Sequence, residues 1–243
     1  MQVEKIRRIG GVQRQLFQPG SMFRRYCETT VGNYCLSDLV KYELVTMMIN
    51  AAPCRMRQAA RRHLYPLIFV HVGRRTIFGE KLIIRRPNRI TIGNDVSIED
   101  EVSLDVKGEG EGITIANGVT IGAGTIVSCT GGHIRIGGGT RIGRRCRLGS
   151  SLGLEIGEHA VFGDECYLVG AAHAYDRKDI PIIDQPLTCR GPNHVGNQVR
   201  IGKGVTVRDG VRIGDDAIVK DDALVINDVL DNAVVAGIPG RFV

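Results

Sequence analysis

The sequence predicts a mainly β protein: a parallel β-helix, in which short strands coil and stack on themselves, preceded by an α-helical cap. An aliphatic residue returns at every sixth position near the C-terminus: Val195, Ile201, Val207, Ile213, Val219 and Val225. A helix repeats its apolar positions at about 3.6 residues and a half-buried strand at about 2, so neither alone sets this period. Six-residue units are typical of a β-helix, in which one unit buries its apolar face only against its neighbours.

The same period occurs upstream in four blocks: Ile92, Ile98, Leu104; Ile115, Ile121, Val127; Ile136, Ile142, Leu148; and Ile156, Phe162, Leu168. Between blocks the spacing slips to 11, 9 and 8 residues, which predicts small loops at a corner of the coil. A β-sandwich has irregular turn spacing and does not hold such a register. At Gly196, Gly202 and Gly214, directly after an aliphatic residue, we expect the chain to turn with a positive φ.

The N-terminal part is helical in pattern. Residues 37–50 and 54–64 place apolar side chains near helical spacing, and the second segment carries a basic face of Arg55, Arg57, Arg61 and Arg62. A helical cap covers the open edge of the first coil, which otherwise exposes unpaired strand groups. Basic and apolar side chains together also suit an interfacial helix pair at an anionic membrane. Both interpretations stay open.

We therefore expect two parts: an N-terminal arm and basic helical cap at residues 1–81, and the β-helix at residues 82–243. The first 36 residues show no clear periodicity and are expected to pack on another subunit. Residues 1–90 carry 17 Lys/Arg against 5 Asp/Glu, whereas residues 91–243 carry 15 against 21. This asymmetry indicates an acidic partner or a membrane surface. No nucleic-acid motif accompanies the basic residues, so nucleic acid is not expected.

Composition limits the remaining classes. The 7 cysteines form no CxxC pair, which disfavours a disulfide framework and a zinc ribbon. Cys146 and Cys166 fall in small apolar positions of the repeat and are expected in the core. No apolar run reaches the roughly 18 residues of a membrane span, and MQVEKIRRIGG lacks a signal-peptide core. We expect a cytoplasmic protein with peripheral contact to the inner membrane face.

The largest interruption of the repeat lies at residues 169–194 and includes GAAHAYDRKDIPIIDQPLTCRGPNH. A long irregular insertion in a regular solenoid more often carries function than stability. It contains His173 together with several charged residues and three prolines. A lone histidine in a loop is often only solvated, but this one lies in the single long insertion.

These segments resemble a known group. GAAHAYD with IPIIDQPLTCRGP, the coil VGNQVRIGKGVTVRDGVRIGDDAIV and the end NAVVAGIPGRFV resemble sugar O-acetyltransferases of the maltose, galactoside and polysaccharide-biosynthesis type. Those enzymes are left-handed β-helix, hexapeptide-repeat acyltransferases. The resemblance covers residues 82–243 and has the repeat, the histidine loop and the terminal AGIPGR in the same order.

The resemblance implies a homotrimer with acetyl-CoA in an outer groove and a sugar or lipid-linked glycan precursor as the acceptor, and no metal. His173 is the expected general base that takes a proton from a sugar hydroxyl, since imidazole titrates near neutral pH. Asp176 is the expected carboxylate that holds its tautomer. Lys203, Lys220 and Arg241 are the expected contacts of CoA.

This chain departs from the group in the donor groove. It has Arg200 where the group usually has Trp, and Lys220-Asp221-Asp222 and Ile226-Asn227 where GAG and TK pairs are expected. Two carboxylates repel a nearby pyrophosphate unless they face away from it. Donor binding is the part of the function that these residues leave open.

Three alternatives remain. A γ-class carbonic anhydrase needs convergent histidines, but position 178, five residues after His173, is a lysine. An N-acyltransferase acting on an amino sugar shares the repeat. A non-enzymatic trimeric scaffold in glycan synthesis is favoured by the altered donor motifs and disfavoured by the histidine loop.

Overall fold

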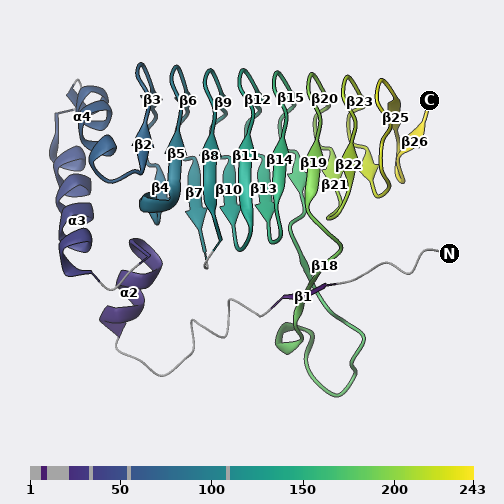
Figure 1. The fold of residues 1–243 in the computed structure, drawn as a ribbon, viewed down its shortest axis with the longest axis horizontal. Helices are drawn as coiled ribbons and strands as arrows, with labels where there is room; N and C mark the ends of the chain where they lie inside the picture. Colours follow the sequence, from purple (N-terminus) through teal and green to yellow (C-terminus); the bar gives the residue numbers. More distant parts are fainter. Residues whose placement is uncertain (1–6, 10–21, 33–34, 54–55, 108–109) are drawn as a thin grey trace.

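The chain forms a long parallel β-helix with helices at its N-terminal end (Figure 1). The computed structural model describes residues 7–9, 22–32, 35–53, 56–107 and 110–243. Each coil passes through three sheets in turn, so that a strand pairs with the equivalent strand of the next coil. The predicted mainly β fold with a parallel β-helix and N-terminal helices is confirmed.

The first sheet holds the strands β2 (His71–Val72), β5 (Ile90–Ile92), β8 (Gly112–Ile115), β11 (His133–Ile136), β14 (Leu154–Ile156), β19 (Asn193–Val195) and β22 (Arg212–Ile213). The second holds β3 (Ile77–Phe78), β6 (Ser97–Ile98), β9 (Thr120–Ile121), β12 (Arg141–Ile142), β15 (Val161–Phe162), β20 (Arg200–Ile201), β23 (Ile218–Val219), β25 (Val234–Ala236) and β26 (Arg241–Phe242). The third holds β4 (Ile83–Arg85), β7 (Ser103–Val106), β10 (Ile126–Cys129), β13 (Arg147–Ser150), β16 (Tyr167–Leu168), β21 (Thr206–Val207) and β24 (Leu224–Val225).

The six-residue series fills the interior of the coil. From Val195 to Val225 none of its members is more than 2% exposed. Burying an aliphatic side chain of this size contributes roughly 1.5–3 kcal/mol, so repetition along the coil builds one continuous core. Cys146 and Cys166 lie in this core, as predicted.

All three slips of the repeat fall between a third-sheet strand and the next first-sheet strand, after β7, β10 and β13. The predicted corner loops are therefore confirmed at one corner of the prism. The long insertion leaves from the same corner, between β16 and β19. We call residues 169–192 the arm.

The corner glycines serve a different purpose from the one expected. Gly196, Gly202 and Gly214 are not among the positive-φ residues; the positive φ falls two residues later, at Gln198 (55°), Gly204 (69°) and Asp216 (56°). These glycines are instead required because the next coil approaches too closely for a side chain.

An Asp or Asn of the following coil occupies that space. A Cβ on Gly202 would lie 2.3 Å from the Asp221 Oδ1, which accepts a hydrogen bond from the Lys203 N–H at 2.9 Å. Asp215 Oδ1 accepts the Asn197 N–H in the same way, at 2.6 Å. The Gly-Asx pattern thus links each coil to the next through a backbone N–H donor at the corner.

The N-terminal helices are α2 (Met22–Thr30), α3 (Leu36–Ala51) and α4 (Arg57–Leu64), followed by the 3-10 turns η2 (Tyr65–Leu67) and, before β5, η3 (Pro87–Arg89). The predicted helices at 37–50 and 54–64 correspond to α3 and α4; residues 54–55 lie outside the described residues. No prediction covered α2.

The cap joins the core of the first coil. Val45 and Ile49 of α3 are buried in the same cluster as the coil interior, and the rings of Tyr65 and Phe78 lie 4.9 Å apart between centroids. The coil begins at His71, ahead of the boundary expected at residue 82, because Val72, Phe78 and Ile84 already hold the period of six. Among the described residues, no helix is both long and apolar enough to cross a bilayer.

Replacing Gly202 with Ala should lower the stability of the coil by about 1–3 kcal/mol, because the new methyl group overlaps the Asp221 carboxylate and amide. Thermal unfolding followed by circular dichroism measures the change. The matched control is Gly191→Ala, whose added Cβ meets its nearest atom at 3.6 Å. Equal unfolding temperatures for the two variants would contradict the proposed role of the corner glycine.

Candidate functional site

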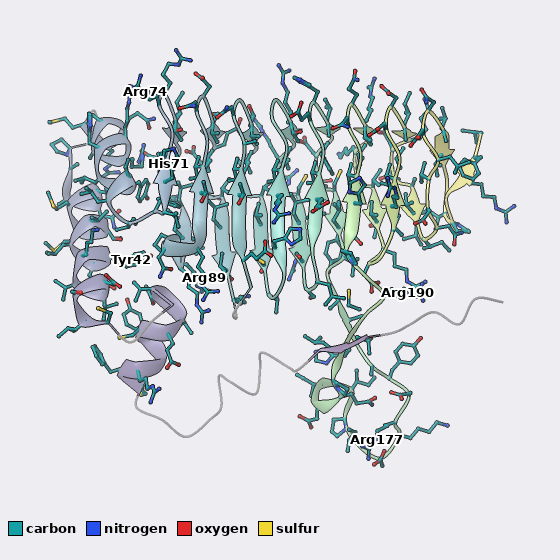
Figure 2. All side chains as sticks on the ribbon, in the orientation of Figure 1. Tyr42, His71, Arg74, Arg89, Arg177 and Arg190 are labelled. Carbon is teal, nitrogen blue, oxygen red and sulfur yellow. The ribbon has the colours of Figure 1, made fainter. Side chains whose placement is uncertain are left out.

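The arm is a hairpin that projects from the side of the coil (Figure 1). Its strands β17 (Ala172–His173) and β18 (Leu187–Cys189) pair antiparallel, with Ala172 opposite Thr188 and His173 opposite Leu187. The 3-10 turn η4 (Ile182–Asp184) lies in the distal part of the arm. Figure 2 shows Arg177 at the far end of the arm and Arg190 where the arm returns to the coil.

A third strand comes from the N-terminus. The strand β1 (Arg7–Ile9) pairs antiparallel with β18, so the sheet order is β1-β18-β17. Cys27 of helix α2 and Val31, which directly follows that helix, pack against Leu39 of α3. Both β1 and the α2 segment therefore contact their own chain; that the first 36 residues also pack on another subunit stays a prediction.

His173 is half-buried and is held by the arm itself. Its Nδ1 lies 3.0 Å from the backbone carbonyl oxygen of Gln185. A carbonyl oxygen only accepts, so this contact assigns the ring proton to Nδ1 and leaves the lone pair on Nε2. A neutral imidazole in this tautomer is able to accept a proton from a hydroxyl group.

The described neighbour of Asp176 is Arg177, whereas we expected Asp176 to contact His173. Asp176 is exposed, and its charge helps to raise the pKa of the Arg177 guanidinium, which is raised chiefly by the hydrogen bond to Asp179. The orienting contact of the His173 Nδ1 comes from the Gln185 carbonyl group. Gln185 was missed from the sequence, because a backbone acceptor leaves no signal in residue types. The role of Asp176 stays a prediction.

Lys203, Lys220 and Arg241 lie at the C-terminal end of the second sheet. Lys203 follows β20, Lys220 follows β23, and Arg241 is in β26; the sheet order there is β26-β25-β23-β20. All three side chains are exposed, and the Lys203 Nζ lies 3.7 Å from Glu165. This region thus presents several cationic groups to solvent.

The neighbouring carboxylate of Asp221 makes a hydrogen bond within the coil. Its Oδ1 accepts the Lys203 N–H of the preceding coil, so this oxygen is directed at the backbone. The departure at Asp221 is therefore explained by corner packing. Asp222 is exposed and adopts a positive φ of 57° at the same corner.

The arm and the three cationic residues occupy different places on the prism. The arm leaves the corner between the third and first sheets, whereas Lys203 and Lys220 follow second-sheet strands at the corner leading to the third sheet. The structure of one chain does not bring them together at one corner.

Two other histidines have structural partners. His133 Nε2 and His194 Nδ1 lie 3.1 and 3.5 Å from the two carboxylate oxygens of Glu155. The pKa of Glu155 is lowered, first by the hydrogen bond from His133. His159 is a corner residue with a positive φ of 55°. His63 lies in α4 of the cap, and His71 lies in β2, the first strand of the coil. Among the described residues, no three His, Cys, Asp or Glu side chains are grouped to hold a metal ion.

Comparisons with known proteins identify the fold. No family profile and no curated protein matches the sequence. Among solved structures, AntD, an N-acyltransferase from Bacillus cereus in complex with dTDP and 3-hydroxybutyryl-CoA, is 21% identical over 75% of this chain and 86% of its own, with a TM-score of 0.52. A variant of AntD in complex with dTDP-4-amino-4,6-dideoxyglucose and coenzyme A gives the same identity and TM-score over 75% and 87%.

A hexapeptide-repeat acetyltransferase from Vibrio cholerae, complexed with acetyl coenzyme A, is 18% identical over 85% of this chain and 86% of its own, with a TM-score of 0.46. At the identities found for AntD, the likeness extends to the fold. The chain thus shares the β-solenoid of hexapeptide-repeat acyltransferases, as the sequence resemblance implied.

Deleting residues 1–21 should leave the coil folded but loosen the arm, since β18 loses its pairing with β1. Two-stranded hairpins are marginally stable alone. We expect an unchanged unfolding temperature and faster proteolytic cleavage within residues 174–186. A deletion of residues 1–6, which retains β1, is the control. Cleavage at the same rate in both deletions would show that β1 does not support the arm.

Proposed function

We propose that the protein is an acetyl-CoA-dependent O-acetyltransferase that transfers an acetyl group to a hydroxyl of a sugar or glycan precursor. The observation that carries the proposal is His173, held by the Gln185 carbonyl group in the tautomer that leaves Nε2 basic. It lies on the one long arm of a coil whose fold is that of AntD, an N-acyltransferase. Sequence motifs and geometry thus favour the same residue.

The chemistry proceeds by direct transfer. His173 Nε2 takes the proton of the acceptor hydroxyl as its oxygen attacks the thioester carbonyl carbon. The carbon–sulfur bond then breaks, and the imidazolium returns the proton to the leaving thiolate of CoA. General base catalysis of this kind contributes about 100- to 10,000-fold in rate. A backbone N–H at a turn of the coil is the proposed donor to the developing oxyanion.

The proposed donor contacts are Lys203, Lys220 and Arg241. They are exposed along the end of one sheet, where cationic side chains favour the phosphates of CoA. The Asp221 oxygen that lies nearby is occupied by the Lys203 N–H, which reduces its repulsion of a pyrophosphate. These contacts favour retention of donor binding in the altered groove.

We infer a homotrimer in which neighbouring chains complete each site. The reason is that the arm and the cationic residues lie at different corners of one prism. Side-by-side packing of prisms brings the arm of one chain to the corner of the next. Asp176, on the same arm, stays the proposed carboxylate partner of the His173 ring.

N-acylation of an amino sugar is the second candidate. One solved structure of AntD contains dTDP-4-amino-4,6-dideoxyglucose, and AntD shares this fold. A base at His173 would serve an amine acceptor as well as a hydroxyl. Matched hydroxy and amino sugars distinguish the two reactions, because an amide product resists mild alkali whereas an ester does not.

Contact with a membrane is proposed for the cap, where a lipid-linked acceptor would be found. Five large apolar side chains of α3 are 46–63% exposed: Leu36, Val40, Leu44, Met47 and Met48. Beside α4, a cavity of about 340 Å³ is lined by Arg62, His63, Arg74 and Arg75, among others. Figure 2 shows Arg74 at the α4 side of the cap. Apolar and cationic groups together suit an anionic lipid surface.

Calorimetric titration with acetyl-CoA should give micromolar affinity, about −8 kcal/mol, in the wild type and in His173→Ala. Acetyl transfer to a panel of sugars, measured as thiol release, should be lost only in His173→Ala, with the exposed His159→Ala as the matched control. No binding by the wild type would favour the scaffold. Turnover by His173→Ala near the wild-type rate would remove His173 from the mechanism.

The wild type should float with vesicles of anionic phospholipid and less with zwitterionic vesicles. The double variant Leu44→Glu/Met47→Glu, which places two charges on the exposed face of α3, should lose flotation. The matched control is Leu230→Glu, at a side chain 69% exposed in the last coil. If all three proteins float equally, or none floats, the cap is not a membrane contact.

A further inference from the structure

The arm encloses one polar side chain almost completely. Gln185 is 3% exposed, although it directly follows η4, whose Ile182 and Ile183 are strongly exposed. A buried amide is costly unless its donor and acceptor groups find partners. The distal part of the arm, residues 174–186, therefore orders itself around a polar group in place of an apolar core.

The amide of Gln185 is satisfied entirely by backbone groups across the arm. Its Nε2 donates to the Arg177 carbonyl oxygen at 2.7 Å and to the Ile180 carbonyl oxygen at 3.3 Å. Its Oε1 accepts the Arg177 N–H at 3.3 Å. Both halves of the amide are used, so the side chain fixes residues 177–180 against residue 185.

The same residue holds the candidate base through its main chain. The Gln185 carbonyl oxygen accepts from His173 Nδ1, and the next carbonyl group, of Pro186, accepts the Ala174 N–H at 2.9 Å. These two contacts close the hairpin directly at His173. Displacement of the Gln185 backbone would break the hydrogen bond from the His173 Nδ1–H and allow the tautomer that carries its proton on Nε2.

We propose that Gln185 is a positioning residue for His173: its buried amide locks the arm so that its carbonyl group keeps the Nε2 of His173 unprotonated and correctly aimed. This inference rests on the proposed function. Gln185 has no catalytic role of its own, because its amide groups are bound within the arm. Its loss should therefore affect kcat and leave the affinity for acetyl-CoA unchanged.

Glutamine is required here in preference to glutamate. A carboxylate has no donor for the Arg177 and Ile180 carbonyl oxygens, and its charge is repelled by them. Placing a carboxyl group among carbonyl oxygens in a buried site raises its pKa, because these surroundings disfavour the charged form. Only the protonated acid can donate to one of the two carbonyl groups, so Gln185→Glu should improve as the pH falls.

The kinetic test compares Gln185→Met, Gln185→Glu and the wild type, with the exposed Gln198→Met as the matched control. Gln185→Met should lose about 100-fold in kcat, the order of loss expected from misplacing a reacting group. The activity of Gln185→Glu relative to the wild type should rise as the pH is lowered. Equal kcat in all four proteins, or a pH-independent ratio, would overturn the proposal.

A second measurement does not depend on turnover. Heteronuclear NMR of the imidazole nitrogens should show the Nδ1–H tautomer of His173 in the wild type and in Gln198→Met, and a mixture in Gln185→Met. An unchanged tautomer in Gln185→Met would overturn the inference. A wild type that shows the Nδ1–H tautomer, lost in Gln185→Met, but acetylates no acceptor would overturn the proposed function alone. Gln185→Asn, which keeps both amide groups on a shorter side chain, serves if Gln185→Met does not fold.

Discussion

The close stacking of one coil on the next is the constraint on which the rest of the structure depends. Equivalent strands pair in register, as Ile201 does with Val219, and the corners between them must approach equally closely. At Gly202 this leaves no room for a Cβ, and the space is filled by the Asp221 carboxylate, which accepts the Lys203 N–H. Inward aliphatics and corner Gly-Asx pairs are thus two consequences of one spacing.

That stacking also allows the arm to exist. The strands β14 and β19 pair in register across the insertion, with Leu154 opposite Asn193 and Ile156 opposite Val195. The coil therefore continues as if the arm were absent. Since the entropic cost of closing a loop rises only slowly with its length, a corner accepts a long insertion as readily as the short slips. The arm, with the candidate base His173, is therefore inserted at a corner without disturbing the core of the coil.

The arm is ordered by different forces from those that order the coil. The coil depends on buried aliphatics, whereas the arm depends on strand pairing and on the buried amide of Gln185. Hydrogen bonds are directional, and hydrophobic burial is not. The hydrogen bonds of Gln185 are accordingly suited to fixing the orientation of the His173 ring, and the rigid coil supports the arm that carries both residues.

The sequence by itself determined the coil, the helices α3 and α4, the corner slips and the position of His173 on the long insertion, because each leaves a period or an interruption of a period. Only the tertiary structure decided the contacts made by main-chain groups and by distant coils. The Gln185 carbonyl group at His173, the pairing of β1 with β18 and the purpose of Gly202 belong to this second class. Backbone acceptors and coil-to-coil distances depend on which distant segments come into contact in the folded chain, and local residue types do not specify those contacts.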